Sequence, residues 1–221
     1  MPLDNINKKI GLFGGTFNPI HYGHLRTAAE IAETFALDKI IFIPSYTPPL
    51  KKTDIAPPSD RFEMVKLAIH DNPIFEVSDI EYHQNQCPSY TLHTVEQFKK
   101  LYQNSKIYFT IGIDAFLDIH LWYQPDILLK EVEFIVIIRP PYLHNDIKRS
   151  KYIKNQTNLN TKTNEIPLIN GHYINLVNVT QLNISSTDIT KKLKNGQSIK
   201  YLLPESVELF IIRKLLYKGD S

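Results

Sequence analysis

Residues 10–25 read Ile-Gly-Leu-Phe-Gly-Gly-Thr-Phe-Asn-Pro-Ile-His-Tyr-Gly-His-Leu, and this stretch decides the fold. Its apolar start, from Ile10 to Phe13, predicts a short buried strand. Gly14 and Gly15 follow, and their lack of side chains lets a ligand approach the backbone closely. From about Gly23 onward, apolar residues recur at helical spacing, at Leu25, Ala28, Ala29, Ala32 and Phe35. The expected order is therefore strand, glycine turn, two histidines and helix.

The two histidines of this stretch suggest its chemistry. His21 and His24 are three residues apart, so on the first turn of a helix they project from one face. The free N–H groups and the dipole at the start of that helix favour an anion. Two imidazoles beside a helix N-terminus suit the phosphates of a nucleotide. The stretch holds no serine or cysteine nucleophile paired with a base.

The amino-acid sequence of this stretch resembles a known signature. Gly-Gly-Thr-Phe-Asn-Pro at 14–19, followed by His21-x-Gly23-His24, is similar to the signature of the HIGH-type nucleotidyltransferase superfamily, which transfers adenylyl or cytidylyl groups onto a phosphate. Within it, the resemblance is to the bacterial nicotinate mononucleotide adenylyltransferases. It implies a Rossmann-like nucleotidyltransferase fold, catalytic roles for His21 and His24, and a mononucleotide contact for Asn18. It also implies ATP binding by Gly14, Gly15, Thr16, Phe17, His21 and His24.

The alternative is that these glycines and histidines have only structural roles. Two glycines after a strand are often only a turn, and a histidine is often only a hydrogen-bonded polar residue. Both together, in this order between a strand and a helix, are far more specific than either alone.

Length and composition limit the alternatives. The 221 residues suit one domain of generous size, or one domain with a small appendage. The hydrophobic fraction of 43% is ordinary for a globular protein. The chain has 25 lysine and arginine residues and 23 aspartate and glutamate residues. This near balance of charge disfavours an extended surface that binds nucleic acid. We expect a single nucleotidyltransferase domain over 1–221 with no nucleic-acid partner.

Cysteine usage and hydropathy predict the compartment and exclude several site types. Cys87 is the only cysteine, so an intrachain disulfide and a multi-cysteine zinc cluster are excluded. His83 and Cys87 could share a metal, but no further ligands are spaced to complete a site, and a free thiol is favoured. No apolar run of 18 residues predicts a membrane span, and residues 1–5 lack the pattern of a signal peptide. We therefore expect a cytoplasmic protein with no membrane partner.

Continuous apolar runs predict strands buried on both faces. After Ile10–Phe13, buried strands are expected at Lys39–Pro44, Ile107–Ile111 and Phe134–Ile138, and Tyr173–Val177 is expected to be the last strand. The alternating segment Phe75–Glu81 predicts an edge strand. Since helical patterns separate these strands, the expected fold class is α/β, with a doubly wound, mostly parallel sheet.

The sequence also predicts where the helices begin and end. One helix is expected from Ser59 or Asp60, which are both good caps, through Ile69. Asp126 is expected to cap another. Further helices are expected at 91–102, 115–118, 184–195 and 204–217, which makes the chain helical over about 185–221. Residues 143–170 are polar and lack periodicity, so a long solvent-exposed excursion with at most one helix is expected there.

Ligands of parallel sheets bind at the carboxyl ends of the strands. That rule predicts that five stretches meet at one edge of the sheet: Gly14–His24, Ser45–Lys52, Gly112–Asp114, Arg139 and Ser185–Thr187. These are also the stretches where the family resemblance is strongest.

Residues 184–189, Ile-Ser-Ser-Thr-Asp-Ile, resemble the second nucleotide signature of the family, Ile-Ser-Ser-Thr-x-Ile-Arg. The resemblance implies ATP binding by Ile184, Ser185, Ser186 and Thr187, and hydroxyls at a helix start suit phosphates. The alternative is a simple N-cap. Thr190 stands where the family has arginine, which removes one cation from the triphosphate site.

Further positions resemble ATP contacts of the family. Gly112 and Asp114 match its Gly-x-Asp at a strand end, where a carboxylate can accept hydrogen bonds from ribose hydroxyls. Arg139 matches an arginine near the adenylyl group, with a surface ion pair as the alternative. Arg61 matches a family arginine too, but on a helix it could be only a solvated charge.

The second substrate is assigned from the resemblance as well. It implies a pyridine pocket from Tyr90, Thr91, Trp122 and Tyr123, in which the indole stacks on an electron-poor ring. Core packing is the alternative for Trp122. Lys51 could bind a phosphate, whereas Leu50 replaces the usual histidine of that loop.

The implied reaction joins ATP and nicotinate mononucleotide into nicotinate adenine dinucleotide and pyrophosphate, a step of NAD biosynthesis. His21, His24 and Mg²⁺ carried on ATP would neutralise the developing charge. Transfer to the amidated mononucleotide or to phosphopantetheine remains open. An ATP-binding regulatory module without turnover also remains open, as does a homodimer. A tRNA-synthetase-like RNA binder is disfavoured by the absence of an anticodon-binding region.

Overall fold

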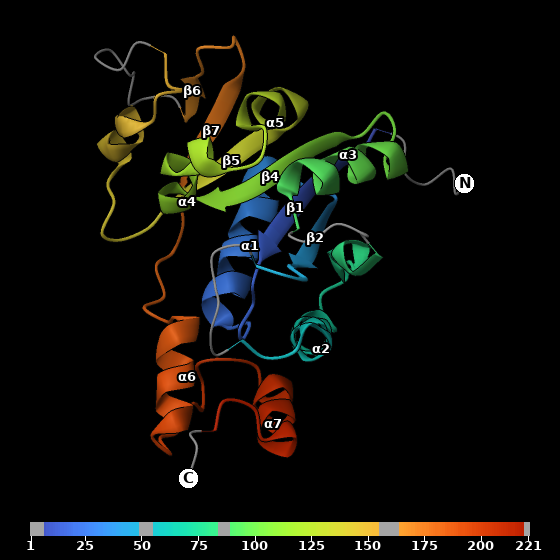
Figure 1. Cartoon of the computed structure of the whole chain (residues 1–221), viewed down its shortest axis with the longest axis vertical. Coiled ribbons are helices and arrows are strands. Elements are labelled where there is room, and N and C mark those ends of the chain that lie inside the picture. Colours follow the sequence, from blue (N-terminus) through green and yellow to red (C-terminus); the bar gives the residue numbers. More distant parts are fainter. Residues whose placement is uncertain (1–6, 49–54, 84–88, 155–163, 219–221) are drawn as a thin grey trace.

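The computed structural model describes residues 7–48, 55–83, 89–154 and 164–218. Within them, seven strands form one sheet in the order β3-β2-β1-β4-β5-β7-β6 (Figure 1). The strands are β1 Lys9–Gly15, β2 Lys39–Pro44, β3 Phe75–Val77, β4 Lys106–Gly112, β5 Glu133–Ile138, β6 Glu165–Pro167 and β7 Tyr173–Asn178. All neighbouring strands are parallel except β6, which runs antiparallel to β7. The predicted doubly wound α/β class is confirmed.

Helices connect the strands, as the periodicity predicts. The α-helices are α1 Tyr22–Phe35, α2 Pro58–Ile69, α3 Thr91–Leu101, α4 Ile113–Leu117, α5 Pro125–Glu131, α6 Ser186–Lys194 and α7 Glu205–Lys214. Short 3₁₀ helices lie at Ile80–His83, Ile119–Leu121 and His144–Arg149. No helix within the described residues is long and apolar enough to cross a membrane.

The winding direction reverses between β1 and β4. Phe13 of β1 pairs with Phe42 of β2 on one side and with Thr110 of β4 on the other. Helices α1, α2, α6 and α7 contribute to one buried cluster, and α3, α4 and α5 contribute to a second. Because such a reversal opens a crevice at the carboxyl ends of the strands, it is where a ligand is expected to bind.

Two predicted helix starts are wrong by a residue or two, and for the same reason. Helix α2 begins at Pro58 and α5 at Pro125. Proline suits the first helical position because its fixed φ is already helical and its missing N–H would have no partner there. Asp60 and Asp126 lie in the first turns instead of capping them.

The edge strand is shorter than predicted. β3 stops at Val77, and the Ser78 backbone N–H makes one more bond, to the Phe42 carbonyl at 2.9 Å. The Ser78 hydroxyl then accepts the Ile80 backbone N–H at 3.2 Å, which turns the chain into the 3₁₀ helix Ile80–His83.

The expectation of a solvent-exposed excursion over 143–170 is wrong for its described residues. Five of its apolar side chains are buried: Ile147, Tyr152, Ile153, Ile166 and Leu168. Strand β6 pairs with β7, and Ile153 bridges to Leu168. These apolar residues are few and irregularly spaced, so their burial depends on pairing with distant strands and leaves no periodic signal.

The C-terminal helices pack on the α1–α2 side of the sheet (Figure 1). Ile189 of α6 and Val207 and Ile211 of α7 are buried in the same cluster as residues of α1 and α2. The Ser206 hydroxyl donates to the Leu67 carbonyl of α2 at 3.1 Å. The helices that follow β7 therefore pack with α1 and α2, from the first half of the chain, in one core.

Candidate functional site

The carboxyl ends of the central strands lie side by side. Gly15 pairs with Pro44 across β1 and β2, and Gly112 pairs with Ile137 across β4 and β5. The predicted gathering of motif-bearing stretches at one edge is thus confirmed for the described residues. Lys51 and Leu50 lie outside the described residues, and so does Cys87.

His21 and His24 form a stacked pair at the start of α1. His21 is the N-cap and His24 is the third helical residue. Their ring centroids lie 3.8 Å apart at an interplanar angle of 29°. The His21 backbone N–H donates to Nδ1 of His24 at 3.3 Å, so a neutral His24 ring carries its proton on Nε2. The two imidazoles share one face, as the spacing predicts.

His21 is neutral at neutral pH in this structure. Its side chain is buried, with 6% of the residue exposed. Burial, and to a smaller extent the positive charge of Arg139, lowers the pKa of His21 to about 4. Nδ1 of His21 is buried without a hydrogen-bond partner among the described residues. At neutral pH the His21 side chain is therefore a neutral ring that can form hydrogen bonds, and not a cation.

Gly23 is required by the position of the His21 ring. A Cβ at residue 23 would lie 2.9 Å from Cε1 of His21 and 3.6 Å from the Ile184 carbonyl oxygen. Residue 23 therefore lies where the start of α1, the His21 ring and the second signature come together, and a side chain larger than hydrogen would collide with the ring.

Asp114 and Arg139 bind each other. Nε of Arg139 donates to Oδ1 of Asp114 at 3.1 Å, and Nη2 donates to Oδ2 at 2.7 Å. A Cβ on Gly112 would lie 2.5 Å from Asp114 Oδ1 and 3.1 Å from Arg139 Nε. The pair is half-exposed at the ends of β4 and β5, where it can orient hydrogen bonds toward a ligand.

The two nucleotide signatures are in direct contact. Ser185 is the N-cap of α6, and its hydroxyl accepts the Asp188 backbone N–H at 3.0 Å. The Ser186 hydroxyl donates to the Pro19 carbonyl of the first signature at 2.9 Å. The starts of α1 and α6 are thus joined, although 167 residues separate the bonded positions. Thr187 is exposed at this start, and the Thr190 hydroxyl donates to its carbonyl at 2.9 Å.

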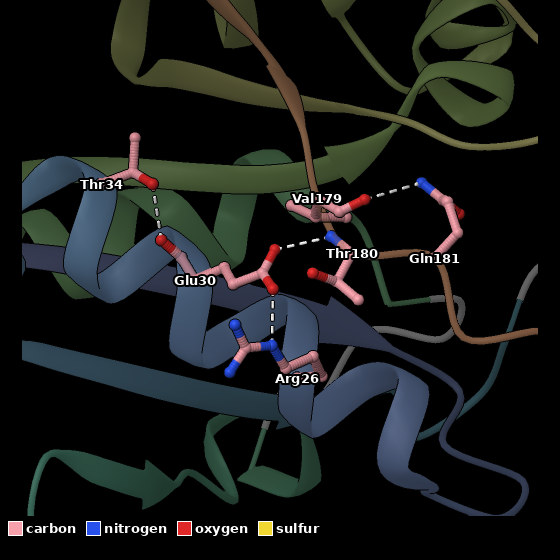
Figure 2. Close-up of polar contacts among 6 residues, drawn as sticks. All are labelled: Arg26, Glu30, Thr34, Val179, Thr180 and Gln181. Carbon is pink, nitrogen blue, oxygen red and sulfur yellow. Dashed lines mark hydrogen bonds and ion pairs between the residues drawn. The ribbon is translucent and has the colours of Figure 1, made fainter.

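A second connection lies farther along α1. The Glu30 carboxylate accepts the Thr180 backbone N–H at 2.7 Å and pairs with Nε of Arg26 at 2.5 Å (Figure 2). The bonds from Thr180 and the Arg26 charge lower the pKa of Glu30. Nε2 of Gln181 donates to the Val179 carbonyl at 3.2 Å (Figure 2). Helix α1 therefore holds the segment that leads from β7 to the second signature.

The side-chain oxygen of Asn18 takes part in the fold. Asn18 is 8% exposed, and its Oδ1 accepts the Ala56 backbone N–H at 2.9 Å and the Tyr217 hydroxyl at 2.8 Å. The peptide bond between Asn18 and Pro19 is cis. The mononucleotide contact assigned to Asn18 stays a prediction.

The interpretation of Arg61 as a solvated charge is wrong. The residue is fully buried. Its guanidinium donates to the carbonyls of Ala56, Thr16 and Tyr46 at 3.0, 2.8 and 3.1 Å. Because Thr16 belongs to the first signature, the hydrogen bond from Arg61 fixes the backbone of the glycine turn.

The residues assigned to the mononucleotide lie at the start of α3 and after the 3₁₀ helix Ile119–Leu121. Tyr90 is the N-cap of α3, and Thr91 is its first residue. The Tyr90 ring stacks on Tyr123, with centroids 4.5 Å apart. Trp122 is partly buried against the α3–α5 core cluster. The structure thus brings Tyr90 and Tyr123 together, whereas the roles of all four residues toward a ligand stay predictions.

Comparison with known proteins places the chain. The Cytidylyltransferase-like family model matches residues 12–192. The chain belongs to this family. The match runs from the glycine turn through α6, so it includes both signatures, and the predicted resemblance to nucleotidyltransferases is confirmed.

Curated relatives cover nearly the whole chain. A protein of Thermoanaerobacter sp. (strain X514), named probable nicotinate-nucleotide adenylyltransferase, is 42% identical over 215 residues, which are 96% of each chain. A protein of Caldicellulosiruptor saccharolyticus with the same name is 40% identical over 95% of this chain and 99% of its own.

Solved structures share the fold. The Plasmodium falciparum nicotinic acid mononucleotide adenylyltransferase complexed with NaAD matches with a TM-score of 0.74 and 23% identity, over 96% of this chain and 98% of that one. The same protein complexed with APC gives a TM-score of 0.70.

Proposed function

We propose that this protein transfers the adenylyl group of ATP to nicotinate mononucleotide, which yields nicotinate adenine dinucleotide and pyrophosphate in NAD biosynthesis. The observation that carries the proposal is the joined pair of signatures: the His21–His24 stack, tied through the Ser186–Pro19 bond to the start of α6. Relatives named for this reaction share about 40% of their residues with the chain over nearly its whole length.

The chemistry needs no covalent enzyme intermediate. A phosphate oxygen of the mononucleotide attacks the α-phosphorus of ATP, and the bond from that phosphorus to the bridging oxygen of the β-phosphate breaks. The electron pair leaves with pyrophosphate. Because the attacking phosphate is already ionised, the protein's work is to align the two phosphates and to stabilise the charge that develops.

The residues at the switch point suit that work. His24 and His21 offer ring N–H groups at the start of α1, where the helix dipole also favours anions. Gly14, Gly15, Thr16 and Phe17 would bring the backbone close to the phosphates, while Ser185, Ser186 and Thr187 offer hydroxyl and N–H groups at the start of α6. Ile184, Gly112, Asp114 and Arg139 complete the ATP site in this proposal.

Magnesium enters with its substrate in this proposal. Within the described residues, no group of three His, Cys, Asp or Glu side chains could hold a metal ion. Mg²⁺ commonly keeps several waters and binds substrate phosphates, which suits a cation carried on the triphosphate. It would add positive charge to the pyrophosphate leaving group.

The mononucleotide is assigned to the other half of the crevice. The N-terminus of α3 at Tyr90 and Thr91, together with Trp122 and Tyr123, offers aromatic surface and backbone N–H groups for a nicotinate ring and its carboxylate. Asn18 and Lys51 are assigned to its phosphate side. We further propose that residues 1–221 act as one domain in the cytoplasm without a nucleic-acid partner, and the core shared by α6, α7 and α2 supports the single domain.

Pyrophosphate release with ATP and Mg²⁺ tests the proposal. We expect turnover with nicotinate mononucleotide and a kcat/KM at least tenfold lower with the amidated mononucleotide or phosphopantetheine. Turnover of either alternative at a higher kcat/KM would replace the proposed acceptor. ATP binding without pyrophosphate release under any of the three conditions would identify an ATP-binding module instead.

A further inference from the structure

A buried carboxylate lies outside the groups that the reaction uses. Glu81, in the 3₁₀ helix Ile80–His83, is 8% exposed. Nothing in the proposed chemistry requires an acid at this position. A buried carboxylate is costly unless its oxygens accept hydrogen bonds, so its partners show what it does.

The partners of Glu81 come from two separate segments, the loop after β2 and the start of α3. Oε2 accepts the Tyr46 backbone N–H at 3.2 Å, and Oε1 accepts the Thr94 hydroxyl at 3.1 Å. The Ser89 side chain also bonds to the carboxylate. Burial raises the pKa of Glu81, while these three bonds and the charge of Arg61 oppose that rise.

Two of these partners bracket the start of α3. Ser89 precedes Tyr90 and Thr91, and Thr94 follows them on the first turn. One carboxylate therefore holds both sides of the segment that presents the α3 N-terminus. Thr94 is 1% exposed, and its hydroxyl also lies 3.5 Å from the Tyr90 carbonyl, so the bond to Glu81 bears directly on the N-cap residue of α3.

The third partner connects this segment to the ATP side. The Tyr46 backbone N–H donates to Glu81, and the Tyr46 carbonyl, in the next peptide group, accepts from Nη2 of Arg61 at 3.1 Å. Arg61 also donates to the Thr16 carbonyl at 2.8 Å. A partly buried chain of hydrogen bonds thus runs from the glycine turn, through Arg61, the Tyr46 backbone and Glu81, to the start of α3.

We infer that Glu81 is a positioning residue, which sets the start of α3 at the correct place relative to the ATP-binding turn and thereby determines how well the mononucleotide binds. The inference rests on the proposed function. Glu81 does not touch the substrates; it acts through Ser89, Thr94 and the Tyr46 peptide. A glutamine removes the charge and puts an NH2 donor where one acceptor oxygen was, so at least one of the three hydrogen bonds must break or reverse its direction.

The test compares steady-state constants for both substrates in Glu81→Gln, Thr94→Val and Thr94→Ser. We expect Glu81→Gln to raise the KM for nicotinate mononucleotide roughly tenfold or more. The KM for ATP should change by less than about threefold, because Arg61 holds Thr16 directly. Thr94→Val should raise the mononucleotide KM in the same direction, and Thr94→Ser should restore it because it keeps the hydroxyl.

The controls separate positioning from a general loss of structure. Glu63→Gln, on the exposed side of α2, should leave both KM values unchanged. If Glu81→Gln does not fold, the Thr94→Val and Thr94→Ser pair decides the question alone. Equal rises in both KM values, or a lowered melting temperature with no rise in the mononucleotide KM, would overturn the inference. If the unsubstituted protein released no pyrophosphate with nicotinate mononucleotide, the proposed function would fail instead.

Discussion

Glu30 and Thr180 are 150 residues apart in the sequence, yet the Glu30 carboxylate accepts the Thr180 backbone N–H at 2.7 Å. Glu30 lies on the helix that begins with the histidine pair, and Thr180 lies five residues before Ser185. The contact therefore helps to fix the distance between the two nucleotide signatures.

Replacing Glu30 with alanine should weaken ATP use. Without the carboxylate, the segment after β7 loses its bond to α1, so we expect kcat/KM for ATP to fall about tenfold, the scale of one hydrogen bond to a charged group. Initial rates with varied ATP measure this. Glu33→Ala, an exposed position on the same helix, is the matched control, and equal effects of the two variants would contradict the prediction.

Acid should destabilise the protein through His21. The pKa of His21 is about 4 in the folded protein, below its ordinary value of 6.5, so the unfolded chain binds more protons between these values. This contribution to stability is fully present above pH 6.5 and is lost as pH falls to 4. Over that window, His21 alone should lower the free energy of unfolding by on the order of 3 kcal/mol.

Urea denaturation at several pH values checks the His21 prediction. His21→Asn should lose stability less steeply between pH 6.5 and 4 than the unsubstituted protein does. His70→Asn, at an exposed position, should keep the original slope. If stability fell equally steeply with falling pH in all three proteins, the pKa of His21 would not differ between the folded and unfolded states, and the prediction would be wrong.

Removing the His24 ring should slow turnover. In a neutral ring the proton is on Nε2, because Nδ1 accepts the His21 N–H, and Nε2–H is the donor that we assign to phosphate. His24→Ala should lower kcat about a hundredfold or more, the scale of losing one preorganised donor, while the circular dichroism spectrum stays unchanged. A folded variant with near-normal kcat would refute a catalytic role for His24.

A methyl group at residue 112 should separate Asp114 from Arg139. The added Cβ of Gly112→Ala would lie 2.5 Å from Asp114 Oδ1, so the pair must move, and we expect kcat/KM for ATP to fall about tenfold. The double variant Gly112→Ala/Asp114→Ala tests the cause. If the pair is already lost in the Gly112→Ala variant, Asp114→Ala should cost less in that background than in the unsubstituted protein; an equal loss in both backgrounds would argue against this explanation.

The sequence predicts most of the sheet, because its signals are local. Runs such as Lys39–Pro44 and Phe134–Ile138 are continuous and apolar, and each became a central strand. The placement of His21 and His24 also follows from spacing alone. The helix starts at Pro58 and Pro125 could have been predicted, since proline prefers the first helical position.

Other features depend on contacts between distant segments. Ile153 is buried where it bridges to Leu168, and no local pattern around either residue predicts that pairing. Arg61 and Glu81 have ordinary polar surroundings in the sequence, and only the fold shows that they meet three carbonyls and three donors. The pairing of Asp114 with Arg139 is likewise invisible from either motif alone.

The Asn18–Tyr217 hydrogen bond spans 199 residues, and this has a consequence for synthesis in the cell. At roughly 5–20 residues per second, a ribosome adds Tyr217 about 10–40 s after Asn18. During that interval the loop beside the histidine pair lacks one of its long-range hydrogen bonds. The loop should therefore reach its final form only after Tyr217 has been added, whatever the order in which the strands assemble.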